Sequence, residues 1–294
     1  AIEKGLLYAG TDRGAFWVTK NEGANWEENS TGLANNYIRS ICPSQFARSR
    51  VYVAMTGINY DDLQSYLYVS EDYGKSWANI AKGLPDEPVN VILEDPTDEN
   101  ILYAGGLRGV YVSTDRGKTW AYLGNNLPAA AVADLEIHEG KMDLVVATHG
   151  RGIYKINLHP IHAMVSKNLP LDKDHLFDIP EIKRPAFSSH SGEVLPQTVE
   201  KTSLSFWLSA AKSMTLSLKD QDNKMVWTTT IQGQKGLNEY RWDMIVKKEE
   251  SDKPYFVHYD QFLEAGNHTL VLSDGTENLE QVFVVKDGTS SIKW

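Results

Sequence analysis

Cysteine is almost absent from this sequence, and long apolar runs are missing altogether. Cys42 is the single cysteine, so the chain cannot form an internal disulfide, and its place at the end of an apolar run before Pro43 predicts a buried strand residue. No apolar run reaches 18 residues, so we expect no transmembrane helix. The chain begins AIEKGLLYAG, without an initiator methionine or a signal peptide, which is typical of a mature or truncated product.

Basic residues are in the minority, with 29 lysines and arginines against 39 aspartates and glutamates and a formal net charge of -10. Binding to a phosphate backbone needs a basic face, so nucleic acid is not an expected partner. Motifs for Ser-His-Asp catalysis, phosphate loops, dinucleotides and Cys-x-x-Cys chemistry are also missing, and we expect no cofactor. His159 and His162 have a spacing that could hold a metal, but no carboxylate or cysteine cluster completes the site, so no metal is expected.

An internal repeat determines the predicted fold. Three segments follow the pattern S/T-x-D-x-G-x-S/T-W. STDRGKTW at 113–120 and SEDYGKSW at 70–77 match fully, and TKNEGANW at 19–26 matches loosely, with asparagine replacing both the aspartate and the second Ser/Thr. Their tryptophans lie 51 and then 43 residues apart, a period that is typical of a four-stranded propeller blade.

Short alternating runs flank each segment and predict the strands of each blade, named A to D from the propeller centre outward. Predicted A strands are 38–42, 89–94 and 132–138. Predicted B strands are 7–10, 51–54, 102–105 and 144–147. Predicted C strands are 16–19, 66–70, 110–113 and 153–156. The repeated pattern then forms the C-to-D turn, and its tryptophan opens strand D.

Each residue type in the C-to-D turn has a structural role. The Asp or Asn accepts backbone N–H bonds across the turn, the glycine supplies a positive φ, and the tryptophan fills the gap between blades. The residues concerned are Asn21, Gly23, Trp26, Asp72, Gly74, Trp77, Asp115, Gly117 and Trp120. Because these aspartates shape turns on the face away from the usual propeller site, we do not expect them to be catalytic.

The repeat resembles the Asp-box (BNR) family, which includes sialidases, xyloglucanase-type glycosidases and the sortilin Vps10 propeller. The phrase DLVVATHGRGIYKI (143–156) and the loop TGINYDDLQSYLYVS (56–70) are most similar to bacterial sortilin-like proteins, often named as glycosyl hydrolases. The resemblance covers about residues 1–158 and implies a β-propeller. It departs from sortilin itself, because no cysteine-rich module follows.

The strand count predicts a partial propeller of about three to four blades. The first repeat begins at strand B, two complete repeats follow, and the last has A, B and C before running into HPIHAM at 159–164. A propeller usually needs at least four blades. We therefore expect the C-terminal part of a larger ring, completed by the upstream part of the same protein or by another chain.

The second half predicts a different module. Residues 159–200 contain five prolines and few regular patterns, so they are predicted to be a packed connector. Strand patterns return over 201–294, and six short strands with turns between them predict an immunoglobulin- or fibronectin-like β-sandwich. LKDQDNKMVWT, GLNEYRWDM and EAGNHTLVL resemble FlgD-type or fibronectin-like domains of secreted bacterial proteins, which implies an accessory or spacer role. The predicted fold class is thus all-β throughout.

Three arginines are the candidate ligand-binding residues. Arg13, Arg108 and Arg151 occupy the same B-to-C turn of their blades, and each precedes a glycine. Descent from one ancestral blade and salt bridges between blades both explain this column. A third explanation is binding of a carboxylate or another anion through bidentate hydrogen bonds.

An insertion of about eight residues at 57–66 enlarges the B-to-C turn of the second blade and carries Tyr60, Asp61 and Asp62. Inserted loops on rigid scaffolds are common sites of function, so Tyr60 joins the ligand-binding candidates. Asp61 and Asp62 are weak catalytic candidates, as an acid or base for glycoside hydrolysis, although adjacent loop carboxylates more often only face solvent. A sialidase would also need a Tyr–Glu pair, and none is evident in the sequence.

The leading hypothesis is a non-catalytic binding module, secreted or periplasmic in a bacterium. It would engage a peptide, protein or glycan through the propeller face. The alternative is a glycoside hydrolase, sialidase- or xyloglucanase-like, with catalytic residues partly in other blades.

Overall fold

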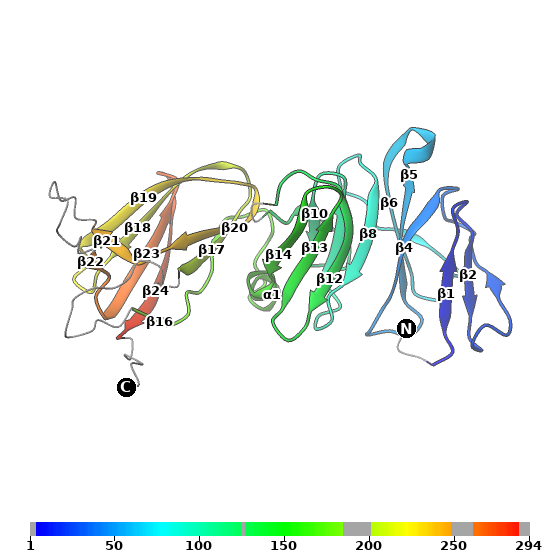
Figure 1. Cartoon of the computed structure of the whole chain (residues 1–294), viewed down its shortest axis with the longest axis horizontal. Coiled ribbons are helices and arrows are strands. Elements are labelled where there is room, and N and C mark those ends of the chain that lie inside the picture. Colours follow the sequence, from blue (N-terminus) through cyan, green and yellow to red (C-terminus); the bar gives the residue numbers. More distant parts are fainter. Residues whose placement is uncertain (1–3, 125–126, 185–200, 248–260, 288–294) are drawn as a thin grey trace. The chain divides into compact units, whose positions relative to one another are not determined.

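The computed structural model describes residues 4–124, 127–184, 201–247 and 261–287. The chain divides into two compact units, Ala1–Ser166 and Lys167–Trp294. Both units are built mainly from antiparallel strands, in agreement with the predicted all-β class (Figure 1). Within the described segments, no helix is long and apolar enough to cross a membrane.

Four antiparallel sheets follow one another along the first unit (Figure 1). The first contains β1 (Leu7–Gly10), β2 (Phe16–Thr19) and β3 (Glu27–Glu28). The second contains β4 (Tyr37–Pro43), β5 (Val51–Gly57), β6 (Asp62–Ser70) and β7 (Ala78–Asn79). The third contains β8 (Val89–Glu94), β9 (Leu102–Gly106), β10 (Val110–Ser113) and β11 (Ala121–Tyr122). The fourth contains β12 (Val132–His138), β13 (Asp143–Thr148) and β14 (Gly152–Asn157).

Each sheet is a meander in chain order, which is the arrangement of a propeller blade. Strand β1 contacts β4, β4 contacts β8, and β8 contacts β12, so the inner strands of successive sheets lie side by side. The first sheet lies at one end of this row and the last sheet at the other (Figure 1). The first unit is therefore a partial propeller, and we refer to its four sheets as blades one to four.

Alternating residues explain why the blades pack on one another. On β5, Val51, Val53 and Met55 pack against Phe16 and Val18 of blade one. The intervening residues of β5 pack in the opposite direction, against blade three: Tyr52 and Ala54 share a buried cluster with Val89, Leu102, Ala104 and Tyr111. Because side chains alternate between the two faces of a strand, one apolar run serves two interfaces.

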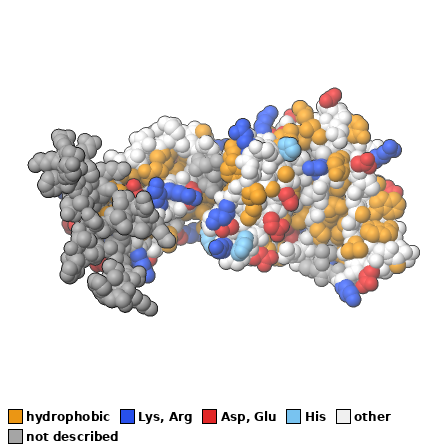
Figure 2. All heavy atoms as spheres, in the orientation of Figure 1, with side chains coloured by type: hydrophobic (Ala, Val, Ile, Leu, Met, Phe, Trp, Pro, Cys, Tyr) orange, Lys and Arg blue, Asp and Glu red, His pale blue; other side chains and the backbone are white. Residues whose placement is uncertain are grey.

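Blade one leaves its other face uncovered in the part of the chain that is described. Leu7 occupies the same strand position as Val51 and Leu102, which are fully buried, yet Leu7 is 48% exposed. Trp26 is 42% exposed. Figure 2 shows apolar side chains gathered over the end of the unit that carries β1 and β2. An apolar surface of this kind is typical of an interface with a further blade or another protein.

Helix α1 (His159–Ser166) belongs to the first unit, although this segment was predicted to lie in an irregular connector. Its apolar residues Ile161 and Met164 are fully buried, and His162 Nε2 lies 2.8 Å from Oδ2 of Asp95. Asp95 is itself fully buried and also accepts a hydrogen bond from the hydroxyl of Tyr103. Burial would raise the pKa of Asp95, but hydrogen bonds from His162 and Thr97 outweigh it and lower that pKa.

The second unit is built around two sheets that share one apolar core. The larger sheet has the order β16 (Ile182–Lys183), β24 (Asn278–Lys286), β23 (Gly266–Ser273), β18 (Lys212–Lys219) and β19 (Met225–Gly233). The smaller sheet has the order β15 (His175–Leu176), β17 (Thr202–Leu208) and β20 (Gly236–Trp242). A short pair joins β21 (Ile245–Lys247) to β22 (Gln261–Phe262).

Leu204 and Phe206 of the smaller sheet pack with Leu216, Leu270 and Phe283 of the larger one. All six predicted strands of this unit are present, whereas the immunoglobulin-like assignment stays a prediction. Part of the predicted connector, 185–200, lies outside the described residues.

Candidate functional site

The blades have two chemically different ends. The meander places the A-to-B and C-to-D turns at one end, and the B-to-C turns with the D-to-A connections at the other. Thr11 in the first B-to-C turn accepts a hydrogen bond from Ile38 N, which follows the next D-to-A connection. His149 N likewise donates to Ala131 O. The B-to-C turns of the described blades therefore lie at a common end, which we term the B-to-C end.

The C-to-D turns are closed by local hydrogen bonds. Asp115 Oδ1 accepts from Thr119 N at 2.9 Å, and Oδ2 accepts from the Thr119 hydroxyl at 2.7 Å. Asp72 binds Ser76 in the same way, at 2.8 and 2.7 Å. Asn21 replaces the aspartate in the first turn but still accepts the equivalent bond, since Asn25 N donates to its Oδ1 at 2.9 Å. Gly23, Gly74 and Gly117 have φ values of 92°, 89° and 80°.

These carboxylates are held in the ionised form. The Ser76 hydroxyl, with backbone donors, lowers the pKa of Asp72. Burial opposes ionisation of Asp115, but its bonds to Thr119 outweigh burial and lower the pKa of Asp115. Carboxylates whose oxygens are used by the turn are poorly suited to proton transfer.

Two of the three turn tryptophans bridge to the preceding blade. Trp77 Nε1 donates to Asn29 O at 2.9 Å, and its ring meets Phe16 edge-on with centroids 4.9 Å apart. Trp120 Nε1 donates to Ile80 O at 2.7 Å. Trp26 departs from the prediction, because it is 42% exposed and its indole N–H has no partner among the described residues.

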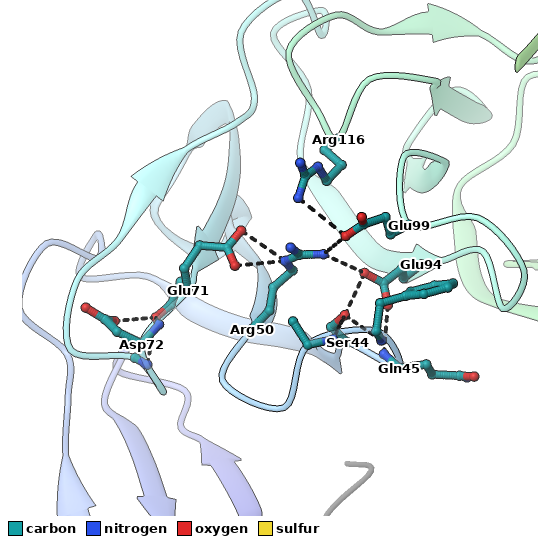
Figure 3. Close-up of polar contacts among 12 residues, drawn as sticks. Ser44, Gln45, Arg50, Glu71, Asp72, Glu94, Glu99 and Arg116 are labelled. Carbon is teal, nitrogen blue, oxygen red and sulfur yellow. Dashed lines mark hydrogen bonds and ion pairs between the residues drawn. The ribbon is translucent and has the colours of Figure 1, made fainter.

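An ion network at the A-to-B end joins blades two and three (Figure 3). Arg50 is 6% exposed and donates to Glu71 at 2.9 Å and to Glu99 at 2.7 Å. Its guanidinium also lies 3.8 Å from Glu94. Glu94 accepts hydrogen bonds from Ser44 Oγ and from the backbone N–H of Gln45. Burial would lower the pKa of Arg50, yet the bonds from Glu99 and Glu71 raise it. All of these groups partner one another, so the network is a structural link.

The three candidate arginines all lie in B-to-C turns with exposed side chains. Arg108 Nε lies 3.7 Å from Glu87 Oε2, within its own blade. Arg13 and Arg151 form no ion pair with any residue that the structure describes. The pair of Arg108 lies within one blade, so among the described residues none of the three arginines forms the salt bridge between blades that was one explanation of the column, and Arg13 and Arg151 remain unpaired there.

The inserted segment of blade two extends the B-to-C hairpin. Strand β5 continues to Gly57, a short 3-10 turn η1 (Ile58–Tyr60) follows, and β6 begins at Asp62. Tyr60 is 67% exposed, and Asp61 is exposed with a φ of 57°. The hairpin thus presents an aromatic ring to solvent beside the arginine turns.

Asp62 differs from its neighbour because its oxygens are occupied. Oδ2 accepts from the Tyr66 hydroxyl at 2.7 Å and from Asn36 Nδ2 at 3.2 Å, and Oδ1 accepts from Gln64 N. These bonds, led by that of Tyr66, lower the pKa of Asp62 and raise the pKa of Tyr66 to about 12. A general acid in glycoside hydrolysis needs a raised pKa, so Asp62 is unsuited to that role.

Glu87 is the residue at this end that sequence reasoning missed. It precedes β8 and is 2% exposed, and its Oε1 accepts from the Tyr111 hydroxyl at 2.6 Å. A Tyr–Glu pair thus exists, although none was evident in the sequence. Burial and the bond to Glu87 raise the pKa of Tyr111 well above its ordinary value, the opposite of what a tyrosine nucleophile requires. The sequence position of Glu87 could have identified it. Glu87 and Asn36 each stand two residues before the residue at which the β-bulge of the first strand in their blade begins.

Comparison with known proteins supports the propeller. The Sortilin-Vps10 family model, described as sortilin, neurotensin receptor 3, matches residues 65–270. No curated protein matches the chain.

Among solved structures, YCF48 bound to D1 peptide is 15% identical, covers 53% of this chain and 52% of its own, and has a TM-score of 0.38. The GH74 xyloglucanase from Xanthomonas campestris is 13% identical over 95% of this chain and 45% of its own, with a TM-score of 0.41. An ancestral GH74 enzyme is 12% identical over 95% and 39%, also with a TM-score of 0.41.

The chain spans about half the length, or less, of these solved proteins. The family match covers well over half of the 294 residues and includes blade three, blade four and most of the second unit. This chain therefore belongs to the Sortilin-Vps10 family.

Proposed function

We propose that this chain is a non-catalytic binding module that engages a peptide, protein or glycan through the B-to-C end of its propeller blades. The observation that carries the proposal is that two carboxylates at that end are occupied by hydrogen bonds while cationic and aromatic side chains are exposed. Asp62 and Glu87 are held by tyrosine hydroxyls, whereas Arg13, Arg151 and Tyr60 project into solvent. Exposed arginines and tyrosines are the side chains most often used as binding anchors.

An extracellular or periplasmic location fits this role, and a bacterial source fits the sequence resemblance. We also propose that a further part of the same protein, or another chain, covers the apolar face of blade one. Leu7 and Trp26 support this, since a neighbouring blade fully buries the residues equivalent to Leu7 in blades two and three and partly buries the residues equivalent to Trp26.

A binding screen with two outcomes tests the proposal. The purified chain is titrated with acidic peptides and with an array of sialylated and neutral glycans, and each ligand is also followed for hydrolysis. Binding without turnover is expected, because Asp62 is a poor general acid and Tyr111 a poor nucleophile. Turnover of any glycan at an enzymatic rate would favour the glycoside hydrolase alternative instead.

The variant R13A/R108A/R151A identifies the face. A carboxylate ligand that bridges these guanidinium groups should lose about 10-fold or more in affinity, the effect of one or more charge-assisted hydrogen bonds. Arg116→Ala is the control for position, because Arg116 is an exposed arginine at the opposite end of blade three from Arg108. Equal losses in both variants would point to non-specific charge and against the B-to-C end.

A further inference from the structure

The carboxylate of Glu87 is buried with one oxygen lacking a hydrogen bond. Oε1 accepts from Tyr111, but Oε2 has no hydrogen-bond donor among the described residues. Arg108 Nε is near, at 3.7 Å, which is too long for a hydrogen bond. A buried carboxylate oxygen without a donor is costly, and such groups in native proteins call for a partner.

At the position equivalent to Glu87, blades two and four leave no buried acceptor without a hydrogen bond among the described residues. In blade two, Asn36 stands at the equivalent position and donates to Asp62, whose oxygens also accept from Tyr66 and Gln64. In blade four, the equivalent residue is Ala130, which has no polar side chain. Only blade three of these three combines a buried carboxylate with an unmet acceptor.

The fold leaves room for the Glu87 carboxylate. A Cβ atom at Gly106 would lie 2.4 Å from Glu87 Oε1, so a side chain there would force the carboxylate to move. Ser65 of the inserted hairpin donates to the backbone oxygens of Pro85 and Glu87, both at 2.7 Å. The inserted hairpin is thus fixed to the backbone that carries Glu87, and we call the surroundings of the Glu87 carboxylate the Glu87 niche.

Charge around the niche favours a cation. The segments that meet there, 57–66, 80–88 and 106–109, carry four carboxylates against two cations. The side chain of Arg108 is 72% exposed, so it can rotate away at little cost in packing. Its Nε lies 3.7 Å from Oε2, so a cationic group can approach this oxygen from the solvent side.

We propose that the Glu87 niche binds the ammonium or guanidinium group of a basic side chain in a peptide ligand. The incoming cation donates to Glu87 Oε2 and takes the place of Arg108. This inference rests on the proposed function, because it uses the same end of the blades, but it reverses the charge of the ligand group expected there.

Titration of the full chain with a tetralysine peptide and a tetraglutamate peptide tests the niche. Glu87→Gln should weaken tetralysine binding about 10-fold, the effect of one charge-assisted hydrogen bond. The matched control Asp12→Asn removes the same charge from an exposed position in the first B-to-C turn and should change affinity by no more than about 2-fold. Equal losses in the two variants would overturn the inference.

Arg108→Ala gives an independent arm, because it removes an exposed side chain and leaves the Glu87 carboxylate in the protein. Removing the competing guanidinium should strengthen tetralysine binding about 3-fold and weaken tetraglutamate binding. Unchanged or weaker tetralysine binding by this variant would overturn the inference, even if Glu87→Gln failed to fold. A chain that binds tetraglutamate or a glycan but not tetralysine would refute the niche and leave the proposed function standing.

Discussion

Replacing Trp77 with alanine tests how the blades are held together. The substitution removes the 2.9 Å bond to Asn29 O, worth about 1 kcal/mol, and the edge-on contact with Phe16, worth about another 1 kcal/mol. Loss of the partly buried indole surface adds about 1 to 2 kcal/mol. We therefore expect the free energy of unfolding of the first unit to fall by about 3 to 4 kcal/mol.

The assay uses the single cysteine to observe the first unit separately from the second. Cys42 lies on β4 as predicted but is partly buried rather than fully buried. Removal from solvent raises the pKa of its thiol to about 11, so it reacts slowly while the unit is folded. Its labelling rate across a urea series reports unfolding of that unit. The control is Trp26→Ala, which should cost about 1 kcal/mol or less, because Trp26 is 42% exposed and makes no comparable bond within the described residues. Equal costs for Trp77→Ala and Trp26→Ala would refute the inter-blade role.

Three further perturbations have defined outcomes. Arg50→Met should lower the stability of the first unit by about 3 kcal/mol or more in the same urea assay, because it leaves Glu94 buried without its cation; a cost below about 1 kcal/mol would contradict this. Gly74→Ala should destabilise by more than about 1 kcal/mol, since φ is 89° and the new Cβ would lie 2.6 Å from the ring of Phe16, and a neutral result by thermal melting would show that the turn can relax. Asp72 and Asp95 have lowered pKa values in the folded state, so the stability they contribute is present above the unfolded pKa of about 4 and is lost as the pH falls through the folded values. Urea midpoints measured from pH 7 to 3 should therefore decline below about pH 4. A flat profile would argue against these bonds.

Local patterns carried most of the fold prediction. The repeat spacing and the alternating runs indicated the partial propeller, because turn chemistry and strand periodicity are local properties of the sequence. The left-handed residue before each turn glycine was not evident, since Glu22, Tyr73 and Arg116 share no side-chain type. Their φ values in the folded turns are 60°, 64° and 58°. Helix α1 was also missed, because its stability comes from burial of Ile161 and Met164 against the blades and not from its own sequence.

The candidate site was harder to predict, since it depends on residues that are distant in the sequence. The positions of the three arginines followed from the repeat, but the pairing of Arg108 with Glu87 depends on how a D-to-A connection lies against a B-to-C turn. Asp62 looked available as a loop carboxylate, and only the structure shows that Tyr66 and Asn36 occupy it. Polar satisfaction is a three-dimensional property, so sequence spacing alone could not reveal it.

A hydrogen–deuterium exchange footprint tests the central claim most directly. The chain is compared with and without the tightest peptide or glycan from the binding screen. Our account predicts slower exchange in the B-to-C segments 11–15, 57–66, 106–109 and 149–152, with no change in the A-to-B turns at 44–50 and 95–101. Protection confined to the A-to-B turns or to the second unit would contradict the proposal that ligands bind at the B-to-C end.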